Sequence, residues 1–387
     1  MNFSTRANGK LLLTGEYFVT EGAVALALPT RLGQSLEFTP LSGVRRPHKI
    51  LRWESYDNNN ELWFATEFVL EDLSILDMPS DESGIAIAEV LQDILKAARH
   101  LNPKFLKFKK HLIAKTTLEF PRNWGLGTSS TLVSMIAQWA EVDAYELLAL
   151  TMGGSGYDIA AARAAGPLLF QKFNGVNRTE AIEFNPPFAQ NLYFVYLGKK
   201  QNSRLAMVYY TTTPPEERHK HIGRISQITH NITKLKEATE AANNLYIAQG
   251  NVTWKSSAFD VYEQTNNTEL PFTKTPTLKA FEALIKEHEE IVSSIIQQPR
   301  AKDIYFSDFW GEIKSLGAWG GDFVLATSER GFEATEKYFN DKGFDTVLTY
   351  DELILSPITE DFTENPTEWS DDIEEEFNFD DFNFDEL

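Results

Sequence analysis

The sequence predicts an α+β fold in two domains, because strand-like and helix-like segments are mixed along the chain instead of alternating strictly. Its 387 residues are enough for two or three domain-sized cores. Short apolar runs typical of strands dominate the first 120 residues, whereas long amphipathic helices separate the strand-like segments after Gly166. We therefore expect one domain over residues 1–180, a second over residues 181–365 and a tail over residues 366–387.

The first half begins with apolar runs at 11–13 and 23–28 and continues with alternating patterns that flank turn residues. Apolar residues spaced three and four apart mark its helices. The expected elements of this half are a hairpin of residues 48–56 and 61–70, a helix over 84–100, a strand over 111–120, a helix over 128–140 and a helix from about 143 to 153.

In the second half, two long helices are predicted from apolar stripes, one around Ile225 and Ile232 and one around Phe281 and Val292. His288 falls on the second stripe and is expected to be a core histidine. The expected strands cover residues 166–173, 191–198, 322–328 and 345–350.

Composition excludes several classes of function. The absence of cysteine excludes disulfides, thiolate metal sites and cysteine nucleophiles. A net charge of −20 argues against a nucleic-acid partner, because phosphate binding needs a positive field. No apolar run approaches the ~20 residues that cross a bilayer. We expect a cytoplasmic protein, a monomer or homodimer, with no membrane partner and a small anionic molecule as its substrate.

The strongest candidate site is the run Pro121-Arg-Asn-Trp-Gly-Leu-Gly-Thr-Ser-Ser130, placed between an expected strand and an expected helix. Glycines let a backbone approach a phosphate closely, and the first N–H groups of a helix are unpaired donors. The run lacks the lysine of a Walker A motif and the third glycine of a dinucleotide fingerprint. A glycine turn with a hydroxyl N-cap is the structural alternative.

Three further motifs accompany this run. Lys10 lies in Gly9-Lys10-Leu11-Leu12-Leu13-Thr14-Gly15-Glu16-Tyr17 and is either a phosphate-facing charge or an edge lysine. Asp158 follows the corner Gly153-Gly154-Ser155-Gly156-Tyr157 and is either a proton acceptor or an N-cap. A second glycine-rich loop, Gly317-Ala318-Trp319-Gly320-Gly321-Asp322, precedes a strand.

In order and spacing, these four motifs resemble the GHMP kinase family over roughly residues 7–325. The Gly15-Glu16-Tyr17 and Gly-Ser-Gly-Tyr-Asp158 sequences look most like the phosphomevalonate kinase branch, with mevalonate kinase next. The resemblance implies an S5-like N-terminal domain, a ferredoxin-like C-terminal domain, and phosphoryl transfer from ATP with Mg²⁺. The implied acceptor is phosphomevalonate or mevalonate, although sugar and homoserine-like acceptors stay open.

The resemblance also implies roles for individual residues. Asp158 would be the catalytic acid/base, and Lys10 would stabilise charge near the acceptor oxygen. Ser129 would ligate Mg²⁺, and Glu146 is the candidate second ligand. The residues that would hold the ATP phosphates are Gly125, Leu126, Gly127, Thr128, Ser129 and Ser130. The residues that we assign to the substrate are Glu16, Tyr17, Ser155, Gly156, Lys199, Lys200, Ser203, Arg204, Gly317 and Gly320.

Other interpretations stay open. A catalytically weak relative, which binds nucleotide or metabolite and acts through its tail, is motivated by Trp319 in the late loop and by the uncertain register of Glu146. A dinucleotide-dependent oxidoreductase is supported only by Gly125-x-Gly127. The tail has four phenylalanines among its acids, and we expect it to dock on its own domain or on a partner.

Overall fold

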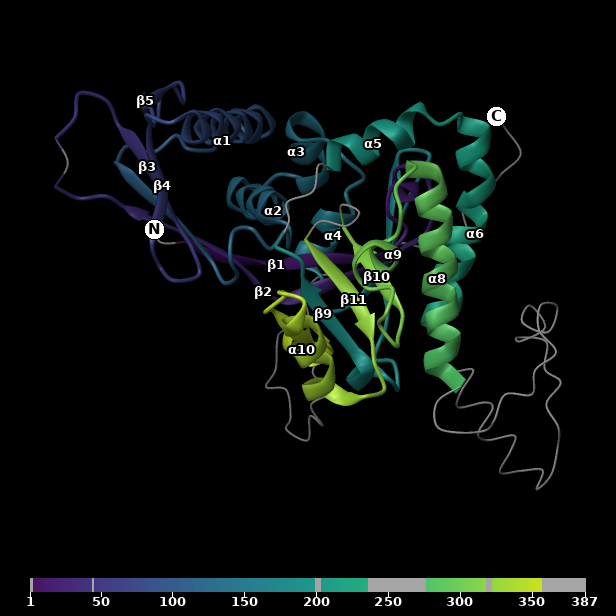
Figure 1. The fold of residues 1–387 in the computed structure, drawn as a ribbon. Coiled ribbons are helices and arrows are strands. Elements are labelled where there is room, and N and C mark those ends of the chain that lie inside the picture. Colours follow the sequence, from purple (N-terminus) through teal and green to yellow (C-terminus); the bar gives the residue numbers. More distant parts are fainter. Residues whose placement is uncertain (1–2, 44, 199–202, 236–275, 318–321, 357–387) are drawn as a thin grey trace, which may run out of the picture. The chain divides into compact units, whose positions relative to one another are not determined.

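The structure is a computed structural model, and it describes residues 3–43, 45–198, 203–235, 276–317 and 322–356 (Figure 1). These residues fall within one compact unit, Met1–Ser356. They form two β-sheets with covering helices, which confirms the α+β class. The division into two domains near residue 180 stays a prediction, and the expected tail lies outside the described residues.

The first sheet has eight strands, all from the first half of the chain. Their order is β5-β4-β3-β6-β2-β7-β8, and β1 pairs with β2 outside this path. β3 and β6 are parallel, whereas the other neighbours are antiparallel. The strands are β1 (Phe3–Thr14), β2 (Ala25–Pro40), β3 (Ile50–Tyr56), β4 (Leu62–Val69), β5 (Ile75–Asp77), β6 (Leu112–Leu118), β7 (Leu168–Phe173) and β8 (Val176–Ala181).

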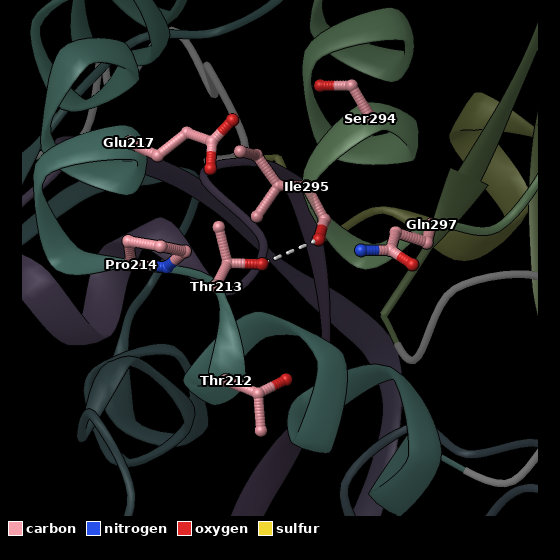
Figure 2. A pocket seen from close by; sticks show the side chains of 7 residues that line it. All are labelled: Thr212, Thr213, Pro214, Glu217, Ser294, Ile295 and Gln297. Atoms are coloured by element: carbon pink, nitrogen blue, oxygen red, sulfur yellow. Dashed lines mark hydrogen bonds between the residues drawn. The ribbon is translucent and has the colours of Figure 1, made fainter.

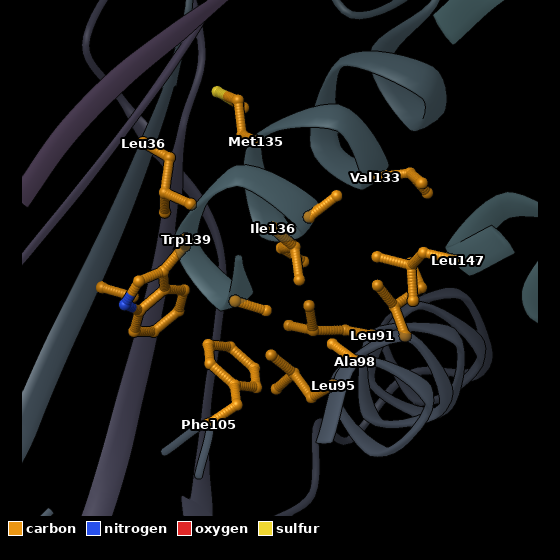
Figure 3. Close-up of a cluster of buried hydrophobic side chains, with 14 of the residues drawn as sticks. Leu36, Leu91, Leu95, Ala98, Phe105, Val133, Met135, Ile136, Trp139 and Leu147 are labelled. Atoms are coloured by element: carbon orange, nitrogen blue, oxygen red, sulfur yellow. The ribbon is translucent and has the colours of Figure 1, made fainter. Parts of the chain in front are cut away.

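Helices α1, α2 and α3 cover one face of this sheet (Figure 1). Their apolar stripes meet the side chains of β2, β3, β4 and β6 in one buried cluster (Figure 3). Trp139 of α2 is part of it, with its ring centroid 4.6 Å from that of Phe38 and 5.0 Å from that of Phe105. The helices of this half are η1 (Phe18–Glu21, 3-10), α1 (Glu82–Leu101), α2 (Thr128–Ala140), α3 (Ala144–Thr151) and α4 (Tyr157–Arg163).

The second sheet has four antiparallel strands in the order β10-β11-β9-β12. Successive side chains of β11 face opposite sides, as a strand requires. Phe323 and Leu325 join the cluster that contains α6 and α8, whereas Val324 and Ala326 join the one that contains α9 and α10. The elements are η2 (Ala189–Asn191, 3-10), β9 (Leu192–Tyr196), α5 (Ser203–Thr212), α6 (Pro215–Thr233), α8 (Pro276–Ile296), α9 (Ala301–Tyr305), β10 (Ile313–Leu316), β11 (Phe323–Thr327), α10 (Gly331–Asp341), β12 (Val347–Thr349) and α11 (Tyr350–Leu353).

Most expected elements are found, but several strands differ in length or were not expected. β1 and β2 extend well beyond the apolar runs that indicated them, because their outer, more polar residues pair with each other. The short strands β5 and β10 and the polar strand β8 had no apolar alternation to indicate them. Among the described helices, none has the length and apolar character needed to cross a bilayer.

The packing of Trp139 leads to a stability prediction. Replacing Trp139 with alanine should lower the free energy of unfolding by about 3–5 kcal/mol, because it leaves a cavity against Phe38 and Phe105. Chemical denaturation would measure the loss. Trp139→Phe keeps an aromatic ring and should lose less. An alanine variant within about 1 kcal/mol of the original would contradict this packing argument.

Candidate active site

The glycine loop, residues 121–130, leads from β6 into α2 and lies against β1. The backbone N–H of Lys10 in β1 donates to the Leu126 carbonyl over 2.9 Å. Gly125 and Gly127 have φ angles of 67° and 93°, in the left-handed region that favours glycine. A Cβ added to Gly127 would lie 3.0 Å from Lys10 Cε, and one on Gly125 would lie 1.8 Å from Asp322 Oδ2. Both positions therefore favour glycine.

The N-terminus of α2 is open to an anion. Gly127 is its N-cap and offers no side chain to the first N–H groups. Ser129 is exposed and Thr128 half-buried, so both hydroxyls lie at or near the surface of the loop. Ser130 is buried and donates to the Gly127 carbonyl over 2.8 Å, so its hydroxyl stabilises the loop itself. Free N–H groups and a helix dipole suit this end of α2 for phosphate.

Lys10 also reaches the second predicted catalytic residue. Its Nζ lies 2.9 Å from Asp158 Oδ1, and it donates to the Tyr157 hydroxyl over 2.9 Å. The Lys10 side chain is 14% exposed and that of Asp158 is 28% exposed, so the pair is mostly buried but still reached by solvent. The structure therefore brings together Lys10, Asp158 and the glycine loop.

The charge state of the pair follows from its surroundings. Burial lowers the pKa of Lys10, but the Asp158 carboxylate and Tyr157 outweigh burial and hold that pKa above its usual value. Burial and the Asp158 charge raise the pKa of Tyr157, so its phenol stays neutral. At neutral pH the lysine is therefore an ammonium ion.

The turn that carries Asp158 is fixed by its buried residues. Ser155 and Gly156 are buried, and Gly156 takes a φ of 97° as the N-cap of α4. A Cβ on Gly156 would lie 3.1 Å from the Tyr145 ring, a tight contact, so both the backbone angle and the available space favour glycine here. The turn thus holds Tyr157 and Asp158 at the first two positions of α4.

Glu16 lies in a buried charge cluster, defined here as Glu16, His288, Glu289 and Lys314. Lys314 Nζ donates to Glu16 Oε1 over 2.5 Å and to Glu289 Oε1 over 3.4 Å. The four side chains are at most 3% exposed. His288 Nε2 accepts from the Gly15 N–H over 2.9 Å, and burial keeps its pKa well below the usual value, so it is neutral.

Lys314 donates hydrogen bonds to two carboxyl groups in this cluster, those of Glu16 and Glu289. Burial raises the pKa of Glu16 and that of Glu289, while Lys314 opposes both shifts. The Glu289 pKa rises to about 7. Because Glu16 is the closer partner of Lys314, we infer that Glu16 keeps the charge and Glu289 holds the proton at mildly acid pH.

The remaining predicted residues are placed less centrally. Tyr17 is buried, with a φ of 64° and its ring 5.6 Å from Tyr210. Glu146 is exposed in the first turn of α3, where its N–H bonds the Asp143 side chain. Ser203 begins α5, next to Arg204. Gly317 follows β10 with a positive φ. Lys199, Lys200, Gly320 and the late-loop Trp319 lie outside the described residues.

Two residues at the site were not assigned roles from the sequence. Tyr157 touches Lys10, and its position next to Asp158 was the available signal. Asp322 packs on Gly125, and its position directly after the late glycine loop was the signal.

A cavity of about 160 Å³ lies elsewhere, at the corner between α5 and α6 and beside the end of α8 (Figure 2). Thr213 donates across it to the Ile295 carbonyl over 3.2 Å. None of the residues that line it belongs to the glycine loop or to the Lys10–Asp158 pair, so we assign it no part in the reaction.

Comparison with known proteins shows the fold. No family model and no curated protein sequence matches the chain. Among solved structures, it is similar to Methanococcus jannaschii mevalonate kinase, with 14% identity, a TM-score of 0.55 and coverage of 90% of this chain and 97% of that one. It is also similar to Streptococcus pneumoniae phosphomevalonate kinase, with 13% identity, a TM-score of 0.53 and coverage of 90% and 98%.

A third similar structure is Lactococcus lactis galactokinase complexed with galactose, with 12% identity, a TM-score of 0.51 and coverage of 90% and 92%. These three enzymes share the GHMP kinase fold. The chain therefore has the fold that its four motifs predicted. Enzymes with this fold include kinases of mevalonate, of phosphomevalonate and of a sugar, so the fold alone does not select a substrate.

The buried charge cluster predicts how stability depends on pH. A carboxyl whose pKa is higher in the folded than in the unfolded state stabilises the native state when the pH lies below the unfolded-state pKa. This contribution is lost as the pH rises through the folded-state pKa. For Glu289 the stabilisation is therefore lost between about pH 4.5, its ordinary pKa, and about pH 7, its pKa in the folded protein. Glu289→Gln should therefore flatten the decline of stability across that window. Denaturation midpoints at several pH values would measure it.

The control for this prediction is Glu290→Gln on the same helix, because Glu290 is 54% exposed. It should leave the pH dependence of stability unchanged. Equal slopes for the original protein and the Glu289 variant would show that Glu289 does not hold the proton.

Proposed function

We propose that this chain is an ATP-dependent kinase of GHMP type, which transfers the γ-phosphate to a small acidic metabolite, with phosphomevalonate or mevalonate as the first candidates. The observation that carries the proposal is the meeting of Lys10, Asp158 and the glycine loop at hydrogen-bond distances. The similar solved structures support a kinase of this fold, and the resemblance of Gly15-Glu16-Tyr17 to the phosphomevalonate kinase branch puts these acceptors first.

The glycine loop fits the phosphates of a nucleotide. Its two glycines leave room that a side chain would fill, and the α2 N-terminus supplies unpaired N–H donors. The exposed Ser129 hydroxyl fits one oxygen position of Mg²⁺, which keeps several waters and binds phosphates as well. When bound, Mg²⁺ would neutralise phosphate charge. Glu146 stays our proposed second ligand, although its described contact is with Asp143.

We assign Asp158 and Lys10 different roles toward the acceptor hydroxyl. The Asp158 carboxylate would accept the proton of the acceptor hydroxyl, as a general base within hydrogen-bond reach does. The Lys10 ammonium lies 2.9 Å from that carboxylate and would stabilise the negative charge near the acceptor oxygen. Little covalent chemistry is then left to the protein, since phosphoryl transfer depends mainly on positioning and charge neutralisation.

Recognition of the acceptor's acid group needs local donors, because the chain as a whole is strongly negative. We propose that Lys199 and Lys200, which follow β9 in the sequence, and Ser203 and Arg204, which begin α5, perform this task. Guanidinium and ammonium groups match carboxylate and phosphate oxygens.

The deciding experiment is a coupled ADP-release assay over mevalonate, phosphomevalonate, galactose and homoserine. Turnover with one acid acceptor well above the rate without acceptor would support the proposal. Binding of ATP without turnover on any member would instead favour the second interpretation, a nucleotide-binding relative with little activity.

Replacing Asp158 with asparagine should lower kcat by about two orders of magnitude or more, the usual scale for loss of a proton acceptor. ATP affinity should not fall, because a carboxylate offers no hydrogen-bond donor to a phosphate and the partner of Asp158 is Lys10. Steady-state kinetics and calorimetric titration of ATP would measure both. Asp341→Asn, an exposed lysine-paired acid on α10, is the matched control. If the Asp158 variant kept near-original turnover, Asp158 would have no catalytic role and would serve only the start of α4.

Replacing Ser129 with alanine should raise the Mg²⁺ concentration needed for half-maximal rate by about tenfold, because an exposed hydroxyl ligand is lost without a core contact. The melting temperature should stay within about 2 °C. Ser294→Ala removes a comparable exposed helix hydroxyl far along the sequence and is the control. If the Mg²⁺ concentration for half-maximal rate did not change, Ser129 would not be a ligand of the metal.

A further inference from the structure

Strand β8 forms one end of the eight-stranded sheet, with β7 on its inner side. In the part of the chain that the structure describes, no strand pairs with its outer side. Five of its six residues are exposed, and Val176 is 58% exposed. An open edge of this kind offers backbone N–H and C=O groups to a strand from another molecule.

The hairpin that contains β8 determines which backbone groups face outward. β7 and β8 are joined by Asn174 and Gly175, whose φ angles of 51° and 79° are those of a type I′ turn. In a two-residue hairpin the flanking pair, Phe173 and Val176, exchanges both hydrogen bonds. The backbone groups of the even-numbered residues of β8 therefore point toward β7, and those of the odd-numbered residues point to the open edge.

The side chains of the even-numbered positions form a self-complementary series. They are Val176, Arg178, Glu180 and, just beyond the strand, Ile182, which read apolar, basic, acidic, apolar. Val176, Arg178 and Glu180 are exposed, whereas Ile182 is half-buried against the cluster that contains α6 and α8. In antiparallel pairing with a second copy about Thr179, Val176 lies opposite the partner's Ile182. Arg178 then lies opposite the partner's Glu180, and symmetry makes each contact twice.

The same register also lets the backbone N–H and C=O groups of the two β8 strands form hydrogen bonds with each other. Thr179 faces the partner's Thr179 as a hydrogen-bonded pair, because its N–H and C=O point outward. Arg178 and the partner's Glu180 then form a non-hydrogen-bonded pair, the type in which side chains approach most closely. A shift of two residues, the smallest that the outward groups permit, would place Arg178 opposite itself or Glu180 opposite itself. Charge therefore selects one register.

We propose that the β8 edge is a homodimer interface, in which two copies of this chain pair antiparallel about Thr179 and continue the eight-stranded sheet across a twofold axis. One pair of short strands buries limited area, so we expect association in the micromolar range, about 1 to 100 µM. About 0.15 M salt would screen the repulsion between two chains of net charge −20.

The test uses the full chain and measures mass by sedimentation and light scattering across that concentration range. The original protein should shift from one chain mass to two. Glu180→Arg and Arg178→Glu each replace two unlike-charge pairs with like-charge pairs, so each should raise the dissociation constant about tenfold or more. An original protein that stays monomeric throughout would overturn the proposal, and so would single variants that dimerise as tightly.

Two combinations separate this interface from a general effect of charge. The double variant Arg178→Glu with Glu180→Arg exchanges the charges and should dimerise like the original. An equimolar mixture of the two single variants should form a heterodimer, because every Arg then faces a Glu. Failure of both combinations to restore association, while each single variant weakens it, would place the contact elsewhere.

A backbone variant and a surface control complete the test. Thr179→Pro removes an N–H that points to the open edge and leaves the bonds to β7 in place, so it should abolish the dimer with little change in melting temperature. Glu89→Arg makes the same charge change on the exposed face of α1 and should leave the dissociation constant unchanged. A Thr179→Pro variant that is folded and dimeric would refute strand pairing.

Discussion

The structure depends on the position of Lys10 in β1, because this one residue joins three parts of the site. Its backbone N–H holds the glycine loop through Leu126, and its side chain holds Asp158 and Tyr157. β1 pairs with β2 over most of its length, with an irregularity between Asn8 and Lys10, and Lys10 itself lies opposite Pro29, so the sheet positions the lysine backbone. A catalytic arrangement needs its groups held to within a fraction of an ångström, and a strand provides that better than a loop.

The other end of β1 is tied to the second half of the chain by buried charge. Lys314 of β10 binds Glu16, while His288 of α8 binds the Gly15 N–H. Removing Lys314 would leave two carboxyl groups buried without a cation, and such a change is costly, about 3–5 kcal/mol. Buried pairs of this kind add little net stability over an apolar core, but they match only one alignment of two elements. The cluster therefore sets where β10, and with it the late glycine loop, begins relative to β1.

Patterns within one segment could be predicted from the sequence, whereas pairings between distant segments could not. The range 128–140 expected for α2 matches the observed helix, because its glycines and apolar spacing are local signals. The association of Lys10 with Asp158 followed only from resemblance, since 147 residues separate Lys10 from Tyr157. The pairing of Glu16 with Lys314 spans 298 residues and has no local signal at all. β8 was not predicted for another reason, because its side chains are mostly polar and it forms a strand only by pairing with β7. The Asn174-Gly175 turn was a usable hairpin signal.

An acidic protein can bind an anionic nucleotide only if short-range donors outweigh its overall field. At physiological salt, charges beyond about 8 Å are largely screened, so most of the net charge of −20 is not felt at the glycine loop. Within that range lie the uncapped N–H groups of α2 and the ammonium of Lys10, whose aliphatic chain packs against Gly127. Asp158 offsets part of the Lys10 charge, because its Oδ1 lies 2.9 Å from the Lys10 Nζ. In the reaction that we propose, the acceptor's proton would pass to Asp158 and neutralise that carboxylate. The Lys10 charge would then act mainly on the phosphoryl group, at the stage when negative charge there is greatest.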